Sequence, residues 1–241
     1  MEIEICANSF TSAKAAQNAG ADRIMLCSEL SVGGLTPSLG LIEKVIIELD
    51  IPVHILIRPR SGNFTYSDED FDVMLRDIAF CGEIGCAGII SGALDHHHEI
   101  DVKRTKQLIN ASQGMDFTFH RAFDWAENPL DEIHKLVDLK VTRLLSSGLQ
   151  PTAFEGISFL KELKEASDSK IEIMPAGGIT IQNAVAFKEA GFRTIHLSAT
   201  TKKQTLYKKP KVSMHSPSFF DDGVVATSDE ETIKEIVTLL S

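Results

Sequence analysis

The chain lacks the features of a disulfide-rich or membrane-spanning protein. It has four cysteines, Cys6, Cys27, Cys81 and Cys86, in 241 residues, with no C-x-x-C pair among them. They are too few for a disulfide framework and fit a reducing compartment. No run of about 18 apolar residues could cross a bilayer, and the first residues contain no secretory signal. We therefore expect a cytoplasmic protein that does not interact with a membrane.

Positive charge and nucleotide-binding glycines are also scarce. The chain has 24 Lys and Arg against 34 Asp and Glu, a formal net charge of −10. This balance argues against nucleic acid as a partner. No G-x-G-x-x-G follows the first apolar run, where a dinucleotide-binding fold places its phosphate turn. No nucleotide cofactor is expected, and assembly into a homo-oligomer is left open.

Short apolar runs alternate with longer amphipathic segments eight times. The expected strands are 2–6, 22–27, 53–58, 87–91, 115–120, 142–146, 171–175 and 194–198, and the expected helices lie near 10–19, 38–49, 68–84, 101–112, 128–139, 152–167, 180–190 and 227–240. Eight such units predict an α/β fold, a parallel eight-stranded (β/α)8 TIM barrel. An open doubly wound sheet is the alternative. Residues 1–241 then form one domain, with 199–226 as a long loop that could cover the site as a flap.

Several expected strands end in groups that can move protons. In a parallel barrel alternate residues point inward, and the last of them line a cavity at the carboxyl ends of the strands. His120 and His196 are candidate acid or base catalysts, and Glu4 either orients an imidazole or is itself the base. A pair between Glu4 and Arg58 that only neutralises buried charge is the alternative.

Other groups at the same face suit a small anion. Arg58 and Arg60 match bidentate capture of carboxylate or phosphate. Gly177 and Gly178 lie between the seventh strand and its helix, where barrel enzymes bind phosphate through backbone N–H groups; a tight turn without a ligand explains them equally. The further candidate anion-binding residues are Arg121, Asp124, Ser147 and Ser198.

Two cysteines predict a metal site. Cys6 and Cys27 end neighbouring strands about 4.8 Å apart, and Met25 lies on the same face. Two thiolates, with or without a thioether, suit Cu(I) better than zinc, which needs more ligands. Buried packing cysteines are the alternative. The consecutive residues His96, His97 and His98 are expected to splay apart on a solvated loop and not to bind one ion.

The same stretches resemble the CutC family. They are Glu4–Cys6, Gly20–Ile24 with Leu26 and Cys27, Gly33–Ser38, Ile57–Arg60 with Phe64, Tyr66 and Ser67, Thr118–Asp124, Leu145–Gly148, and His196 with Ser198. The resemblance implies a TIM barrel, a cytoplasmic location and a role in copper homeostasis and copper binding. This chain has Met25 where the family typically has Glu, and Ser146 where it more often has Thr. Two functions stay open: a Cu(I)-binding protein, or an enzyme that acts on a small anionic substrate.

Overall fold

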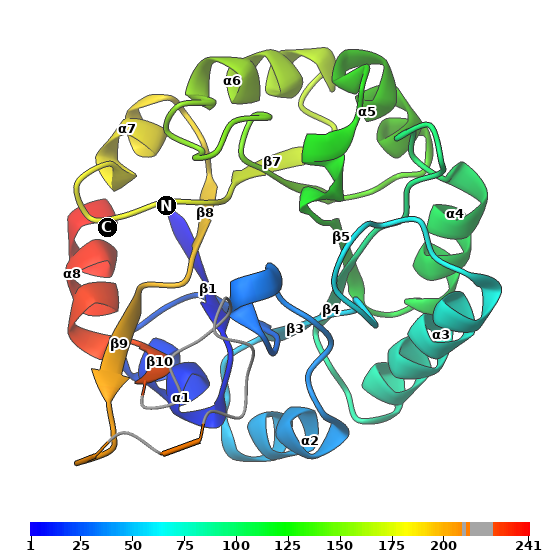
Figure 1. Ribbon diagram of the computed structural model, residues 1–241. Coiled ribbons are helices and arrows are strands. Elements are labelled where there is room, and N and C mark those ends of the chain that lie inside the picture. Colours follow the sequence, from blue (N-terminus) through cyan, green and yellow to red (C-terminus); the bar gives the residue numbers. More distant parts are fainter. Residues whose placement is uncertain (209–210, 213–223) are drawn as a thin grey trace.

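Eight parallel strands form a nearly closed barrel in the computed structural model, which describes residues 1–208, 211–212 and 224–241 (Figure 1). The strands are β1 (Glu2–Ala7), β2 (Arg23–Leu26), β3 (Val53–Leu56), β4 (Gly88–Ser91), β5 (Asp116–Phe119), β6 (Arg143–Ser146), β7 (Glu172–Pro175) and β8 (Thr194–Leu197). Each pairs in parallel with its neighbour, β1 pairs with β8, and one bridge between Ala176 and His196 joins β7 to β8. The predicted TIM barrel is confirmed.

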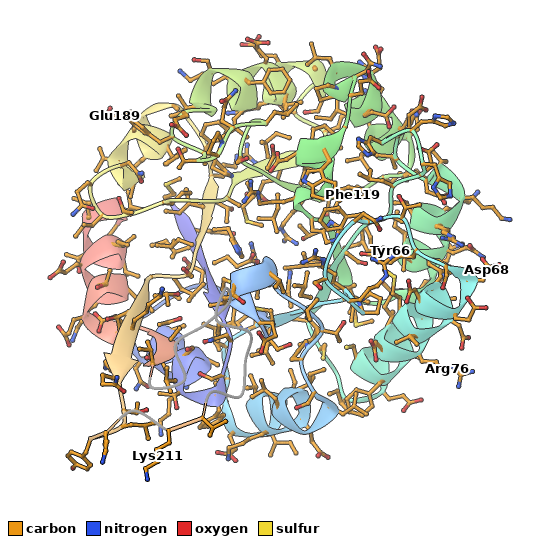
Figure 2. All side chains as sticks on the ribbon, in the orientation of Figure 1. Tyr66, Asp68, Arg76, Phe119, Glu189 and Lys211 are labelled. Atoms are coloured by element: carbon orange, nitrogen blue, oxygen red, sulfur yellow. The ribbon has the colours of Figure 1, made fainter. Side chains whose placement is uncertain are left out.

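Helices cover the outside of the barrel. They are α1 (Phe10–Asn18), α2 (Leu39–Glu48), α3 (Asp68–Glu83), α4 (Val102–Ala111), α5 (Pro129–Asp138), α6 (Ile157–Ala166), α7 (Ala184–Glu189) and α8 (Glu230–Leu240). Charged side chains such as Arg76 and Glu189 project outward from this ring, whereas Phe119 is buried between a strand and the helices (Figure 2). The N-terminus lies beside the end of α8, where the amino group of Met1 is 3.5 Å from the Leu240 carbonyl oxygen.

Local sequence explains where the helices begin. Ser67 caps α3 in a reciprocal capping box with Asp70, because each side chain accepts a hydrogen bond from the other residue's backbone N–H. Pro129 occupies the first turn of α5, where a missing N–H costs nothing. Asp229 caps α8 by accepting the N–H of Thr232.

The structure differs from the prediction mainly in where two of the helices begin. The expected helices at 152–167 and 180–190 begin later, at Ile157 and Ala184, because Thr152 with Glu155 and Thr180 with Asn183 form hydrogen-bonded turns first. Two short 3-10 helices, η1 (Leu30–Val32) and η2 (Arg121–Trp125), lie in the loops after β2 and β5.

The expected loop at 199–226 contains two strands. β9 (Thr200–Gln204) pairs in antiparallel fashion with β10 (Val224–Ser228), so that the last helix begins at Glu230 and not at 227. Three β-branched residues in β10, Val224, Val225 and Thr227, favour the strand over a helical start. The rest of the expected flap, residues 209–210 and 213–223, lies outside the described residues.

Candidate functional site

A cavity of about 700 Å³ opens at the carboxyl ends of the barrel strands, a volume typical of small-molecule sites. It collects residues from both halves of the chain. The predicted site residues that line it are Cys6, Met25, Arg58, His120, Arg121, Gly177, Gly178, His196 and Ser198. The predicted site residues that do not line it are Glu4, Cys27, Arg60, Asp124 and Ser147. Glu4 acts on the cavity through its neighbour His196.

Glu4 and His196 form a hydrogen-bonded pair at the floor of this cavity. Nδ1 of His196 lies 2.7 Å from Oε1 of the buried Glu4. Burial on its own raises the pKa of Glu4, but the hydrogen bond with His196 and nearby positive charge outweigh it and lower the pKa to about 2. Because an ionised carboxylate can only accept, Nδ1 of His196 carries the proton. Nε2 is then the ring nitrogen of His196 that can act as a base, and the His196 side chain lines the cavity.

Arg23, not Arg58, neutralises Glu4. Nε of Arg23 donates to Oε2 of Glu4 at 2.6 Å, and Nη1 lies 3.6 Å from the carboxylate of Glu2. The expected pairing of Glu4 with Arg58 is therefore wrong. Arg23 was missed, although its position two residues before the inward Met25 would have placed it on the same face.

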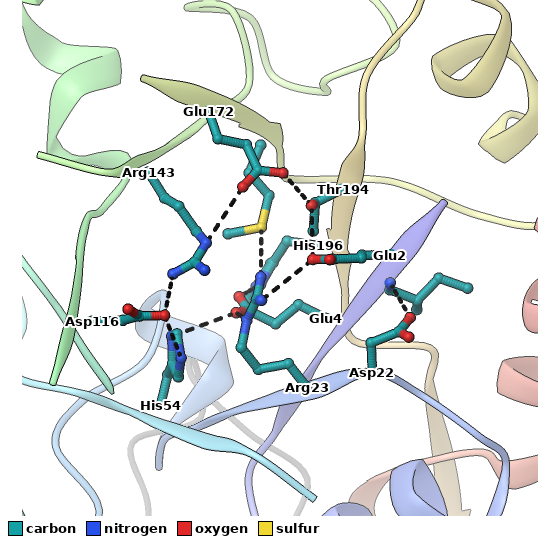
Figure 3. Close-up of polar contacts among 12 residues, drawn as sticks. Glu2, Glu4, Asp22, Arg23, His54, Asp116, Arg143, Glu172, Thr194 and His196 are labelled. Atoms are coloured by element: carbon teal, nitrogen blue, oxygen red, sulfur yellow. Dashed lines mark hydrogen bonds and ion pairs between the residues drawn. The ribbon is translucent and has the colours of Figure 1, made fainter. Parts of the chain in front are cut away.

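A charged layer continues below Glu4 through the barrel interior (Figure 3). Arg143 pairs with Asp116 at 2.7 Å and with Glu172 at 3.4 Å. His54 lies between Glu4 and Asp116, at 3.9 and 3.8 Å, and burial lowers the pKa of His54 to about 4, so that its ring is neutral at pH 7. Of this layer His54 lies nearest to Glu4, without a hydrogen bond to it, so that the carboxylate is held by Arg23 and His196.

His120 is a neutral hydrogen-bond donor on the cavity wall. Its Nδ1 accepts the backbone N–H of Ala122 at 3.3 Å, which leaves the ring proton on Nε2. Burial and the charge of Arg58 lower the pKa of His120 to about 3. Within the described residues its buried Nε2 has no hydrogen-bond partner. Such an N–H can stabilise negative charge that develops on a substrate oxygen.

Arg121 supplies positive charge to the same cavity. Its Nε donates to Asp124 at 2.7 Å and its Nη2 to the hydroxyl of Ser147 at 2.8 Å. Asp124 is almost fully buried and also accepts the backbone N–H of Ser147 and the hydroxyl of Ser146. Asp124 and Ser147 therefore position the guanidinium, which remains 43% exposed.

Of the two glycines after β7, Gly177 lies against this arginine and Gly178 against Thr152. A Cβ at Gly177 would come within 2.9 Å of Nη1 of Arg121, and a Cβ at Gly178 would come within 2.8 Å of Thr152. Both glycines also have positive φ, 105° and 67°. Close packing thus requires glycine here whether or not a ligand binds. Ser198, at the end of β8, lines the same cavity.

The structure assigns Arg58 and Arg60 to loop construction. Nη1 of Arg58 donates to the carbonyl oxygens of Val32 and Gly34 at 2.6 and 3.0 Å, and Nη2 donates to that of Gly62 at 2.9 Å.

Arg60 lies outside the cavity lining. It donates to Asp70 at 2.8 Å and to the carbonyl oxygen of Thr65 at 2.8 Å. The expectation that both arginines anchor an anion does not hold for Arg60, because its donors are directed to the loop that carries it. Arg58 lines one wall of the cavity, but most of its N–H groups already donate to loop carbonyl oxygens.

Cys6 and Cys27 approach each other as the strand order predicts. Their sulfur atoms are 3.6 Å apart, and both side chains are buried. They lie in an apolar cluster with Met25 and Leu56. The hydrogen bond to Cys27 and burial raise the pKa of the Cys6 thiol. Two sulfur ligands fit a two-coordinate soft ion, and no group of three or more His, Cys, Asp or Glu side chains in the described part of the chain could hold a metal that needs more.

Comparison with known proteins agrees with this architecture. Protein CutC from Yersinia enterocolitica is 40% identical over 99% of this chain and 95% of its own length, and that from Glaesserella parasuis is 37% identical over 100% and 99%. A solved structure from Streptococcus agalactiae, named as a candidate copper homeostasis protein CutC, has 34% identity and a TM-score of 0.77 over 82% of this chain and 98% of its own. A structure named as an aldolase, at 11% identity and a TM-score of 0.62, shares the fold alone. No helix in the described residues is long and apolar enough to cross a membrane. The CutC family model matches residues 1–201, and the chain belongs to the CutC family.

Proposed function

We propose that this CutC protein is an enzyme that performs acid–base chemistry on a small anionic substrate. The observation that carries the proposal is the pair of Glu4 and His196 at the floor of a cavity of about 700 Å³. A buried carboxylate that fixes the tautomer of an imidazole is the usual support for a histidine base.

Each of the three polar groups around the cavity has a distinct part. His196 takes a proton through Nε2, and Glu4 stabilises the imidazolium that results. His120 donates its Nε2–H to the substrate oxygen on which charge develops. Arg121, held by Asp124, binds the anionic group of the substrate. The chemistry this supports is proton abstraction next to a carbonyl or a related elimination, in which a base and an oxyanion donor act together.

Calorimetry with a panel of phosphorylated and carboxylated metabolites tests the anion site. We expect at least one compound to bind, with an affinity that falls tenfold or more in Arg121→Ala, about 1.4 kcal/mol. Arg76→Ala is the matched control, because Arg76 is an exposed residue of α3 whose only ion pair among the described residues is with Asp72 on its own helix. If every compound binds the two variants equally, Arg121 is not an anion anchor.

A search for turnover tests the base. A metabolite extract is incubated with wild type, with His196→Asn and, as a control, with His134→Asn on the exposed face of α5. Mass spectrometry should show a compound consumed by wild type and the control but not by His196→Asn. A compound consumed equally by all three proteins would refute the role of His196.

Copper binding is a second candidate, favoured by the 3.6 Å separation of the sulfur atoms of Cys6 and Cys27. We propose that these two thiols would hold one Cu(I), with the thioether of Met25 nearby. Their apolar surroundings exclude competing water and suit a soft monovalent ion. We also propose a role in copper homeostasis, which the name of the Streptococcus agalactiae relative supports, and a cytoplasmic location, which the small number of cysteines supports.

Competition against a Cu(I) chelator tests this site. We expect one equivalent to bind wild type, and binding to be lost in Cys6→Ala with Cys27→Ala. The matched control is Cys81→Ala with Cys86→Ala, because these two thiols are equally buried but lie elsewhere, in the last turn of α3 and just before β4. Equal affinity in both double variants would reject the site.

A further inference from the structure

A second, smaller pocket adjoins the cavity, and its walls are aromatic. Its volume is about 230 Å³, and it lies where the loops after β3, β4 and β5 meet. Phe64, His98 and Trp125 each come from one of these loops. The ring of Trp125 lies 4.9 Å from that of Phe64, edge to face, and 6.3 Å from that of His98.

The histidine-rich loop is held in the shape this pocket needs. Asp95 accepts the backbone N–H groups of His97 and Glu99 at 2.8 and 3.0 Å, and its own N–H donates to the Glu99 carbonyl oxygen at 2.8 Å. The turn places His98 at a φ of 60°, an uncommon conformation for a residue other than glycine. All three histidines are exposed, as expected for a solvated loop, and His96 and His98 also line the pocket, whereas His97 does not.

Neighbouring loops are joined beneath the pocket. The backbone N–H of Leu94 donates to the Phe64 carbonyl oxygen at 3.0 Å, and the hydroxyl of Thr65 donates to the Asp95 carbonyl oxygen at 3.1 Å. The walls are thus supported by backbone contacts and do not depend on a ligand to assemble.

The lining indicates what would bind. The indole of Trp125 is 47% exposed and offers an apolar face. Asn63, His96 and His98 surround it with hydrogen-bonding groups, and none of the described residues that line the pocket carries a carboxylate that would select a cation. The volume is below the range of about 300–1,000 Å³ that holds drug-sized ligands, so a single ring is the expected size. One aromatic face bordered by polar groups fits a ring with C–H groups on its faces and hydroxyls on its edge.

Phe64 connects this pocket to the cavity. Its ring lies 4.9 Å from that of His120 and 4.8 Å from the guanidinium carbon of Arg58, and Phe64 lines both spaces. The ring of Phe64 therefore lies between a ligand group on Trp125 and His120, one of the groups proposed to act on the substrate.

We propose that this pocket binds a hexose ring, which makes the substrate a sugar derivative with an anionic group. The assignment of the ring to the substrate rests on the proposed function, whereas binding of the ring itself does not. In this proposal the sugar ring binds at Trp125, and the anionic group is the one that Arg121 binds.

Fluorescence provides a direct test, because Trp125 is the single tryptophan of the chain. Wild type is titrated with methyl glucoside, methyl galactoside and, as a ring with one hydroxyl, cyclohexanol. We expect a saturable change in emission with at least one glycoside and weaker binding of cyclohexanol. His98→Gly removes one wall while suiting the positive φ, and should weaken glycoside binding tenfold or more. His97→Gly, on the same loop, should leave it unchanged.

Three results would overturn the proposal: no glycoside binds, cyclohexanol binds as tightly, or the two loop variants behave alike. A second titration separates it from the proposed function. Hexose 6-phosphates should bind more tightly than the methyl glycosides, and Arg121→Ala should remove that advantage only. If the glycosides bind through His98 but the phosphate adds nothing, the sugar pocket stands and its assignment to an anionic substrate fails.

Discussion

Replacing Glu4 by Gln should lower the stability of the barrel in a pH-dependent way. Glu4 is fully buried, and its oxygens are 2.6 Å from Nε of Arg23 and 2.7 Å from Nδ1 of His196. Gln has nearly the same shape but no charge. The substitution therefore removes the charge while leaving the packing in place.

The pKa of Glu4 gives the magnitude. It falls from 4.5 to about 2, and at about 1.4 kcal/mol per unit this contributes about 3 kcal/mol to the free energy of unfolding at pH 7. Because the folded pKa is the lower one, this contribution is complete above pH 4.5 and is lost as the pH falls toward 2. At pH 3 the linkage relation leaves about 1.4 kcal/mol of it.

Urea unfolding of wild type and Glu4→Gln at pH 7 and pH 3 measures this directly. The difference in free energy of unfolding should be about 3 kcal/mol at pH 7 and about half of that at pH 3. Glu43→Gln, on the exposed face of α2, is the control and should stay within about 0.5 kcal/mol at both values. An equal loss at the two pH values for Glu4→Gln would show that its charge is not what stabilises the barrel.

Three further substitutions test other contacts. Arg58→Ala should lower the free energy of unfolding by about 3 kcal/mol in urea, because three loop carbonyl oxygens lose their donor. An unchanged free energy of unfolding would mean that Arg58 does not stabilise these loops. Gly156→Ala should cost about 3 kcal/mol in the same assay, because the added Cβ would lie 2.0 Å from the Ser147 carbonyl oxygen, and wild-type stability would contradict that packing. Asp124→Asn should weaken anion binding by about tenfold in calorimetry, equivalent to about 1.4 kcal/mol, because Arg121 loses its charged partner; equal affinity would mean that Asp124 does not position it.

Much of the site followed from the period of the strands. Residues two apart face the same way, so the inward positions of Cys6, Met25, His120 and His196 could be read from their spacing. Strand order in a barrel then made β1 and β2 neighbours, which brought the two thiols within 3.6 Å. Such inferences need only the alternation of side chains along a strand and the closure of the sheet into a barrel.

The partners of the long charged side chains did not follow in this way. Arg58 and Arg60 follow a strand as an anion anchor would, yet their flexible stems carry the guanidinium groups into loop carbonyl oxygens. Arg23 begins β2 and donates to Glu4, its register partner on the neighbouring strand β1, inside the barrel. The reach of an arginine covers several acceptors, and only the folded loops decide which acceptor is closest.

The sequence by itself determined the barrel, the face at which the cavity opens and the family to which the chain belongs, because period, turn residues and strand endings are local properties. Only the tertiary structure decided that Arg121 rather than Arg60 faces the cavity, that Glu4 holds His196, and that the loop of His98 meets Trp125. Those contacts join residues from separate βα units, and their geometry depends on how the loops pack on one another. A pattern within a single segment of the sequence therefore does not predict the geometry of these contacts.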